Sequence, residues 1–328
     1  MLPARFRARA YAKINLGLKI VARREDGFHE LRTVFQTISL ADTLELAISP
    51  GRGISLELSG LTAPAGGGNL AYRAAAAARE RFGVRGHVAI RLTKRIPVGA
   101  GMGGGSSDAA AVIRMLALAA RRPPRLEAQF KLARELGSDV PAFLLGGTVL
   151  GMGRGDEVYA LPDLAPWQCL LSMPRDAVGA GLSTPSAFAA WDQSHPASPP
   201  LTGSARSDTL LGFCSLVDQV LPAFRKLRNR GPRMPPAGVA GPKVHAGIEN
   251  DFLAGVFSLS PDFSRIHSQL CRSSAAWVGL TGSGAAQFAL YASADRAEAG
   301  ARSLSRQFCS WRARFLSRRA YQRALQTE

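Results

Sequence analysis

Residues 97–111 of the chain read PVGAGMGGGSSDAAA, a glycine-rich run that leads into an apolar segment ending at Ala120. Glycine lets a backbone approach a ligand with no Cβ in the way. Ser106, Ser107 and Asp108 are of the types that cap helix starts, and the Ala-, Leu- and Met-rich segment after them favours a helix. The free N–H groups and the dipole at such a start attract phosphate. The run therefore predicts a phosphate-binding loop, with a flexible linker as the plainer alternative.

The glycine pattern does not match the common nucleotide loops. Gly99, Gly101 and Gly104 satisfy G-x-G-x-x-G, but a dinucleotide fold needs an acidic residue about twenty positions later, where residues 123–125 are Pro-Pro-Arg. A P-loop ends in Gly-Lys-Ser/Thr, and no lysine follows these glycines. The His-Arg-Asp and Asp-Phe-Gly triplets of protein kinases are absent too. The loop is therefore expected to bind phosphate through its backbone, with any catalytic cation supplied from elsewhere.

Length and hydropathy indicate a globular protein. The 328 residues suit one large or two medium domains, and 46% hydrophobic with 20% charged residues is ordinary for soluble proteins. No apolar run is long enough to span a bilayer, and the basic N-terminus lacks the apolar region of a secretory signal. We therefore expect a cytoplasmic protein with no membrane partner, an organelle transit peptide being the disfavoured alternative.

The cysteines agree with a reducing compartment. Cys169, Cys214, Cys271 and Cys309 lie far apart, with no C-x-x-C pair and no histidine partner nearby. This spacing argues against a zinc site and fits the cytosol.

The net charge of +17 favours phosphorylated or polyanionic partners. The positive charges are spread along the chain, so they do not single out nucleic acid. Arginines with aromatic neighbours recur over residues 312–323, where a nucleic-acid patch is one interpretation and a solvated final helix is the favoured one.

Alternation and helical periodicity predict an α+β chain in which strands and helices are intermixed. Strands are expected at 5–21, 33–40, 43–48, 54–58, 87–92 and 168–173. A strand and turn are expected over 148–155, and residues 277–284 and 287–291 are expected to form a strand, a glycine turn and a second strand. Helices are expected to end near Phe82, to follow the glycine run, and to cover 126–136, 210–228 and 266–270. Proline and glycine accumulate over 192–247, which predicts long exposed loops around the 210–228 helix.

Five motifs resemble those of the GHMP kinase superfamily. They are the glycine run Pro97–Ser107, Thr281-Gly-Ser-Gly284, Ala12-Lys-Ile-Asn-Leu16, Asp26-Gly-Phe-His-Glu30 and Leu136-Gly-Ser-Asp-Val-Pro141. The combination of the last three is most similar to the branch of kinases that phosphorylate a cytidyl diphosphate alcohol in the non-mevalonate isoprenoid pathway. The resemblance covers residues 8–160 well and 245–292 moderately, and it is thin between 190 and 245.

The resemblance implies a two-lobed α+β fold with the active site in the cleft between the lobes. The N-terminal lobe would be similar to ribosomal protein S5 and would span residues 1–165 with the ATP-binding segment. The C-terminal lobe would be ferredoxin-like and would span 166–328, including the loops at 192–247.

The resemblance also implies a nucleotide site for ATP with Mg²⁺. It assigns to that site Asn69, Lys94, Pro97, Val98, Gly99, Ala100, Gly101, Met102, Gly103, Gly104, Gly105, Ser106 and Ser107. No metal ligand is assigned, although the Ser107 hydroxyl is a candidate for contact with phosphate or Mg²⁺, with simple helix capping as its alternative role. Asp108 replaces an amide common in relatives and would add negative charge close to the phosphates.

Asp139 and Lys13 would be the catalytic pair. A carboxylate can accept the proton of an attacking alcohol, and a neighbouring lysine keeps it ionised and can meet a phosphoryl oxygen. Taken singly, Lys13 would be a strand-surface lysine and Asp139 a helix-end cap.

The resemblance further implies a site for a small cytidyl diphosphate substrate. Asn15 would lie near the substrate hydroxyls, His29 would bind the cytosine edge, and Phe28 and Phe188 would stack on the two faces of the base. Imidazole offers one donor and one acceptor to a pyrimidine, and stacking on an aromatic ring contributes about 1–3 kcal/mol per base.

Two alternatives remain open at this point. One is a GHMP kinase for a simpler alcohol, of the mevalonate or homoserine type, for which Phe28 and His29 would have no base to bind. The other is a basic nucleic-acid-binding protein on a degenerate kinase fold, which the pairing of Lys13 with Asp139 disfavours. The oligomeric state, the reason for the basic charge and the source organism are not indicated by the sequence.

Overall fold

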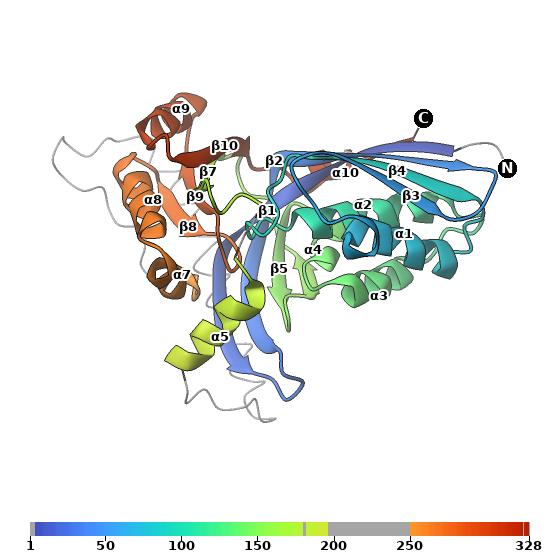
Figure 1. Ribbon diagram of the computed structural model, residues 1–328, viewed down its shortest axis with the longest axis horizontal. Coiled ribbons are helices and arrows are strands. Elements are labelled where there is room, and N and C mark those ends of the chain that lie inside the picture. Colours follow the sequence, from blue (N-terminus) through green and yellow to red (C-terminus); the bar gives the residue numbers. More distant parts are fainter. Residues whose placement is uncertain (1–3, 180–181, 196–249, 324, 328) are drawn as a thin grey trace.

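The computed structural model describes residues 4–179, 182–195, 250–323 and 325–327. Most of the proline- and glycine-rich region, the predicted helix at 210–228 and Cys214 lie outside the described residues. The described parts form two β-sheets, each with helices on one face, and they are joined along a long two-stranded ribbon (Figure 1).

The ribbon consists of β1 (Ala4–Arg23) and β2 (His29–Ser49), which pair antiparallel along nearly their whole length. The sequence predicted two strands between 33 and 48, and the structure has one continuous strand there. Register shifts interrupt the ribbon next to Lys13 and Asn15. Residues 10–18 of β1 are buried on both faces, because the ribbon lies between the helices of one sheet and the strands of the other.

The first sheet has the order β11-β1-β2-β4-β3, with β5 paired to β2 and β6 paired to β5. Its other strands are β3 (Ile54–Gly60), β4 (His87–Lys94), β5 (Thr148–Met152), β6 (Glu157–Ala160) and β11 (Leu325–Thr327). Its helices are η1 (Gly66–Gly68), α1 (Leu70–Arg81), α2 (Gly104–Ala119), α3 (Leu126–Leu136) and α4 (Val140–Leu145). Alanines of α1 and α2 pack against leucines and isoleucines of β2 and β4, which places α2 directly beneath the ribbon.

The second sheet is antiparallel with the order β10-β7-β9-β8. Its strands are β7 (Gln168–Pro174), β8 (Trp277–Leu280), β9 (Gln287–Tyr291) and β10 (Phe308–Arg314). The helices beside it are α7 (Leu253–Leu259), α8 (Pro261–Arg272) and α9 (Ala294–Ser303). Two more helices lie elsewhere: α5 (Thr184–Ser194) lies beside the far end of the ribbon, and α10 (Arg318–Gln322) packs on the first sheet (Figure 1). Cys169, Leu171 and Met173 alternate with Leu170, so one face of β7 packs against the ribbon and the other against α8 and α9.

Two local expectations are wrong. The predicted final helix over 312–323 is instead the end of β10, followed by the five-residue α10, because β7 offers β10 a pairing edge. The predicted cap at Ser106 to Asp108 is absent, since α2 begins at Gly104 with Gly103 as its N-cap, and Ser107 and Asp108 are buried inside the helix.

The predicted division of the chain after residue 165 stays a prediction. After β10 the chain returns to the first sheet, where β11 pairs with β1. No helix in the described part of the chain is long and apolar enough to cross a membrane.

Candidate active site

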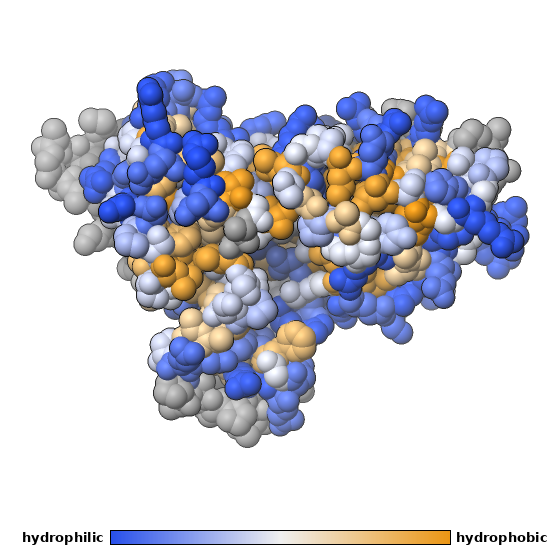
Figure 2. Space-filling view, viewed as in Figure 1, coloured by the Kyte–Doolittle hydropathy of each residue, from blue (hydrophilic) through white to orange (hydrophobic). Residues whose placement is uncertain are grey.

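A cleft of about 1000 Å³ opens where the glycine run, the far end of the ribbon, α5 and the 281–284 turn meet. Figure 2 shows this face hollowed between α5 and the helical layer of the first sheet. The residues predicted from the sequence that line the cleft are Lys13, Asn15, Phe28, His29, Asn69, Lys94, Pro97, Val98, Gly99, Ala100, Gly101, Met102, Gly103, Gly104, Gly105, Ser106, Asp139 and Phe188. Ser107 does not line it: its side chain is buried and its hydroxyl has no partner among the described residues.

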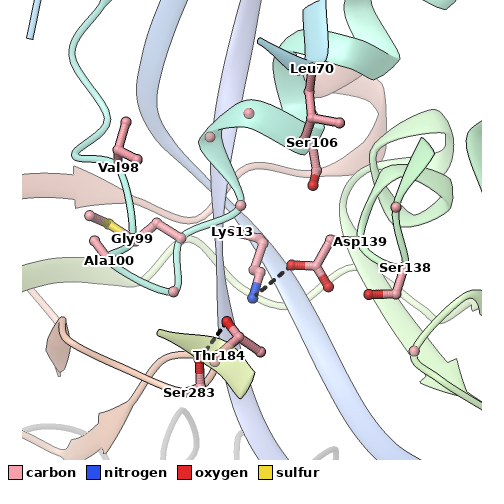
Figure 3. Close-up of a pocket in the computed structure, with 18 of the residues that line it drawn as sticks. Lys13, Leu70, Val98, Gly99, Ala100, Ser106, Ser138, Asp139, Thr184 and Ser283 are labelled. Carbon is pink, nitrogen blue, oxygen red and sulfur yellow. Dashed lines mark hydrogen bonds and ion pairs between the residues drawn. The ribbon is translucent and has the colours of Figure 1, made fainter. Parts of the chain in front are cut away.

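The start of α2 forms one wall of the cleft. Gly103 adopts a left-handed conformation (φ 68°), and no side chain caps the helix. The first N–H groups of a helix have no partner within it, so those of this uncapped start remain available beside the positive end of the dipole. Ser106 adds a hydroxyl at the same place (Figure 3). This wall suits a phosphate group.

The glycine run is held by the 281–284 turn of the other sheet. Thr281 donates its hydroxyl to the carbonyl of Gly101 over 3.0 Å, and Ala286 N–H donates to the carbonyl of Ala100 over 3.2 Å. A Cβ on Gly101 would lie 2.0 Å from the Thr281 carbonyl oxygen, which shows how closely the backbones approach. The two glycine motifs therefore form one structural unit.

Lys13 and Asp139 form an ion pair in the wall of the cleft. The distance between Lys13 Nζ and Asp139 Oδ2 is 3.3 Å (Figure 3). Lys13 is 4% exposed, so it is not a strand-surface lysine. Asp139 occupies the N-cap position of α4, but its carboxylate accepts no hydrogen bond from that helix. Its side chain instead points to Lys13, and a catalytic role for the two residues stays a prediction.

Asn15 joins Lys13 to both lobes. Its Oδ1 accepts hydrogen bonds from Lys13 Nζ and from Gly282 N–H, each over 2.7 Å. Its Nδ2 donates to the Thr33 hydroxyl over 2.7 Å. Asn15 therefore fixes the lysine relative to the 281–284 turn, and one Nδ2 hydrogen is left for a ligand.

A buried ionic cluster lies beneath the start of α2. Lys94 Nζ pairs with a carboxylate oxygen of Asp42 and with Asp108 Oδ2, the latter at 2.7 Å. Burial alone would lower the pKa of Lys94, but the two carboxylates outweigh it and raise that pKa. Burial raises the pKa of Asp108 to about 7, against the pull of Lys94, and its Oδ1 has no hydrogen-bond partner among the described residues. Lys94 is therefore neutralised within the protein and contributes little free positive charge to the cleft.

The cluster predicts how stability changes with pH. An unfolded Asp108 loses its proton near pH 3.8, whereas the folded one keeps it until about pH 7. The folded state then binds more protons in this window, so the contribution of Asp108 to stability is lost as the pH rises from about 4 to 7. Asp108→Asn cannot ionise, so the difference in Tm between variant and wild type should be more positive at pH 8 than at pH 5, as measured by calorimetry. An equal difference at both pH values would contradict this origin. The exposed Asp295→Asn is the control.

Aromatic rings surround the other end of the cleft. The His29 ring stacks on Phe188 with centroids 4.4 Å apart, and its Nε2 lies 2.7 Å from Asp192 Oδ1. Phe28 is 52% exposed and packs one face against Arg154. Phe188 thus contacts His29 rather than standing free as a second wall, so the predicted stacking of a base between Phe28 and Phe188 stays a prediction.

Asn69 caps the start of α1. Its Oδ1 accepts from Ala71 N–H over 2.9 Å, and its Nδ2 donates to the Pro64 carbonyl over 2.8 Å. These bonds hold the segment that faces the glycine run across the cleft, and direct contact of Asn69 with a nucleotide stays a prediction.

The residues at the cleft fit an ATP molecule whose Mg²⁺ is bound mainly by its own phosphates. Among the described residues no group of three His, Cys, Asp or Glu side chains could hold a metal by itself. Mg²⁺ is usually held by one or two carboxylates together with substrate phosphates, and Asp139 is a carboxylate at the cleft. Ser106, and not Ser107, presents a hydroxyl to the cleft, and contact of a serine hydroxyl with phosphate or Mg²⁺ stays a prediction.

Several residues at or behind the cleft had no motif to indicate them. Asp42, buried behind the wall of the cleft, lies within a strand. Asp192 lies near the end of α5, and Arg134 and Arg154 lie in segments without a distinctive pattern. The spacing from Phe188 to Asp192 is one helical turn, and it is the one signal that could have placed the carboxylate near the aromatic rings.

Comparison with known proteins extends this description. Residues 69–147 match the family model described as GHMP kinases N terminal domain, and residues 242–309 match GHMP kinases C terminal. The chain is 40% identical over 283 residues to 4-diphosphocytidyl-2-C-methyl-D-erythritol kinase of Solibacter usitatus, covering 86% of this chain and 80% of that protein.

Solved structures show the same fold. A crystal structure of 4-(cytidine 5'-diphospho)-2C-methyl-D-erythritol kinase superposes with a TM-score of 0.72 at 33% identity, covering 94% of this chain and 98% of the other. Homoserine kinase from Cytophaga hutchinsonii superposes with a TM-score of 0.65 at 17% identity, covering 99% and 97%. The second likeness bears on the fold alone.

Proposed function

The chain belongs to the 4-diphosphocytidyl-2-C-methyl-D-erythritol kinases of the GHMP kinase superfamily, and we propose a reaction for its cleft on that premise. The protein transfers the γ-phosphoryl group of ATP to the 2-hydroxyl of 4-diphosphocytidyl-2-C-methyl-D-erythritol, giving the 2-phosphate and ADP. This step belongs to the non-mevalonate route to isoprenoid precursors and takes place in the cytoplasm. The observation that carries the proposal is the Lys13–Asp139 pair, which faces the same cleft as the uncapped start of α2.

Each reacting group has a residue suited to it. Asp139 accepts the proton of the substrate hydroxyl as that oxygen attacks the phosphoryl group. Lys13 pairs with the Asp139 carboxylate and stabilises negative charge on the transferring group. Asn15 holds Lys13 in place and directs its remaining N–H toward a substrate hydroxyl.

The glycine run binds the phosphates of ATP through the backbone N–H groups at the start of α2. Mg²⁺ would be held by the ATP phosphates with Asp139 or Ser106, and it would neutralise phosphate charge during transfer. Lys94 orders this wall through Asp42 and Asp108.

The aromatic end of the cleft binds the cytosine. A carboxylate partner favours the His29 tautomer with the proton on Nε2, which leaves Nδ1 as an acceptor for the exocyclic amino group of the base. Phe28 offers an exposed ring for stacking, and Phe188 supports His29 from the other side. Neither feature has a use in a kinase for mevalonate or homoserine.

ADP release from the purified protein tests the proposal. We expect turnover with 4-diphosphocytidyl-2-C-methyl-D-erythritol and none above background with mevalonate or homoserine at the same concentration. Turnover of a simpler alcohol without turnover of the cytidyl compound would refute the assignment.

The His29→Ala variant refines the same assay. It should raise KM for the cytidyl substrate by about tenfold, because the base loses one hydrogen bond and Phe188 loses the ring on which it stacks. KM for ATP should stay unchanged. An unchanged KM for the cytidyl substrate would remove His29 from the base site.

A further inference from the structure

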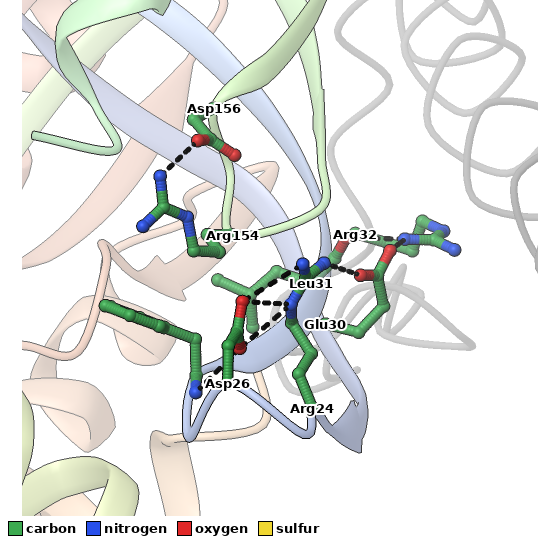
Figure 4. Close-up of polar contacts among 8 residues, drawn as sticks. Arg24, Asp26, Glu30, Leu31, Arg32, Arg154 and Asp156 are labelled. Atoms are coloured by element: carbon green, nitrogen blue, oxygen red, sulfur yellow. Dashed lines mark hydrogen bonds and ion pairs between the residues drawn. The ribbon is translucent and has the colours of Figure 1, made fainter. Parts of the chain in front are cut away.

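Two arginines meet at the wall of the cleft between its aromatic end and the catalytic pair. Arg134 comes from the last turn of α3, and Arg154 from the turn between β5 and β6. Both are held by Asp156: Arg154 donates a terminal N–H to the Asp156 carboxylate over 2.7 Å (Figure 4), and Arg134 donates Nε–H to its carbonyl over 3.3 Å. Asp156 is itself buried, so it is a firm anchor.

Arg154 is also fixed by an aromatic contact. Its guanidinium lies over the Phe28 ring, 4.8 Å from the centroid. A guanidinium that stacks on a ring and is anchored at one end loses little further freedom when it binds a ligand.

The remaining donors of these two arginines are free. Within the described residues Arg134 makes one hydrogen bond, through Nε, and Arg154 one, through a terminal nitrogen. Arg154 is ion-paired with Asp156 through one terminal nitrogen, and its other nitrogens have no hydrogen-bond partner among the described residues. The neighbouring cations use more of their donors: Arg24 pairs with Asp26 and Glu30, and Arg32 pairs with Glu30 (Figure 4). Arg134 and Arg154 therefore carry donor groups that face the cleft without a partner.

We infer that Arg134 and Arg154 form the site for the diphosphate of the cytidyl substrate. This inference rests on the proposed function. Arg154 contacts Phe28, which is proposed to stack on the cytosine. Arg134 lies in the last turn of α3, just before Asp139, which is proposed to accept the proton of the reacting hydroxyl. In the substrate the diphosphate lies between the cytidine and the methylerythritol that carries the reacting hydroxyl. Two forked guanidinium groups match the geometry of phosphate oxygens and compensate their charge.

Calorimetric titration with CDP and with cytidine tests the inference. The full-length protein is first saturated with a non-hydrolysable ATP analogue, so that the nucleotide wall is occupied. Wild type should bind CDP more tightly than cytidine. Arg134→Gln and Arg154→Gln should each weaken CDP binding by about tenfold, and the double variant by about a hundredfold, with the affinity for cytidine changed less than about twofold.

Two further variants separate charge from position. Arg154→Lys keeps the charge and loses the fork and the guanidinium contact with Phe28, so its CDP affinity should fall between wild type and Arg154→Gln. Arg121→Gln removes the same charge from an exposed position outside the cleft and should leave CDP affinity unchanged. Thermal unfolding of each variant checks that it is folded.

The outcomes distinguish failure of the arginine site from failure of the proposed kinase function. If wild type prefers CDP and the double variant keeps that preference, the arginine site is refuted while the kinase assignment stands. If wild type binds neither cytidine nor CDP, the proposed function is refuted and the inference with it.

Discussion

Asp139→Asn is expected to lower kcat for phosphorylation by about 10³-fold, with ATP affinity near that of wild type. The amide has the shape of the carboxylate but cannot accept the proton of the attacking hydroxyl. It also removes the partner that faces Lys13 at 3.3 Å, so the lysine is left without its counter-charge. Steady-state ADP release and titration with a non-hydrolysable ATP analogue measure the two quantities.

Stability should change little in this variant. The Asp139 side chain makes no cap to α4 and is 31% exposed, so the pair with Lys13 is the contact that is lost. Asp295→Asn places the same substitution on an exposed helix start outside the cleft and should leave kcat unchanged. An Asp139→Asn protein that keeps more than about a tenth of wild-type kcat would mean that another group accepts the proton.

The fold was largely predictable because its signals are local. Alternation over 5–21 and helical periodicity over 126–136 correspond to β1 and α3. The two-lobed α+β fold of the GHMP kinases, inferred from five motifs, is confirmed by the superpositions. The final segment could not be predicted in this way, because arginines at 312–314 become strand only through pairing with β7, far away in sequence.

The residues proposed for catalysis and phosphate binding could be placed at one cleft for another reason. Lys13, Asp139 and the glycine run each lie in a motif, and the structure brings them to one cleft. What the motifs omit are partners contributed by distant segments. Asp42 reaches Lys94 across neighbouring strands, and Asp192 reaches His29 from α5. Such contacts depend on tertiary packing, which leaves no periodic trace in sequence.

The start of α2 also depends on a contact that the local sequence does not reveal. Ser106, Ser107 and Asp108 have the composition of a cap, yet α2 begins two residues earlier, at Gly104. The reason lies in Lys94, whose ammonium is buried beneath this turn and draws Asp108 inward as its partner. An inward Asp108 fixes the phase of the helix, so that Ser107 is buried as well.

Gly101→Ala is expected to reduce kcat/KM by at least about 100-fold. Gly101 has φ +74°, and an added Cβ would meet the carbonyl oxygens of Thr281 at 2.0 Å and of Gly284 at 2.9 Å. Both obstacles are backbone atoms, which cannot swing aside as a side chain can. The glycine run and the 281–284 turn would have to separate, displacing the start of α2 from Lys13 and Asp139.

Gly83→Ala distinguishes this clash from backbone strain alone. Gly83 also has a left-handed backbone, with φ +65°, but an added Cβ there would meet nothing within 4 Å. Both variants therefore carry the left-handed penalty of about 1–2 kcal/mol, and Gly101→Ala alone carries the steric conflict. We expect Gly83→Ala to lower Tm by several degrees and to keep its kcat/KM, because α1 ends far from the reacting groups. Equal losses of activity in the two variants would mean that strain, and not contact between the two glycine motifs, governs the geometry of the cleft.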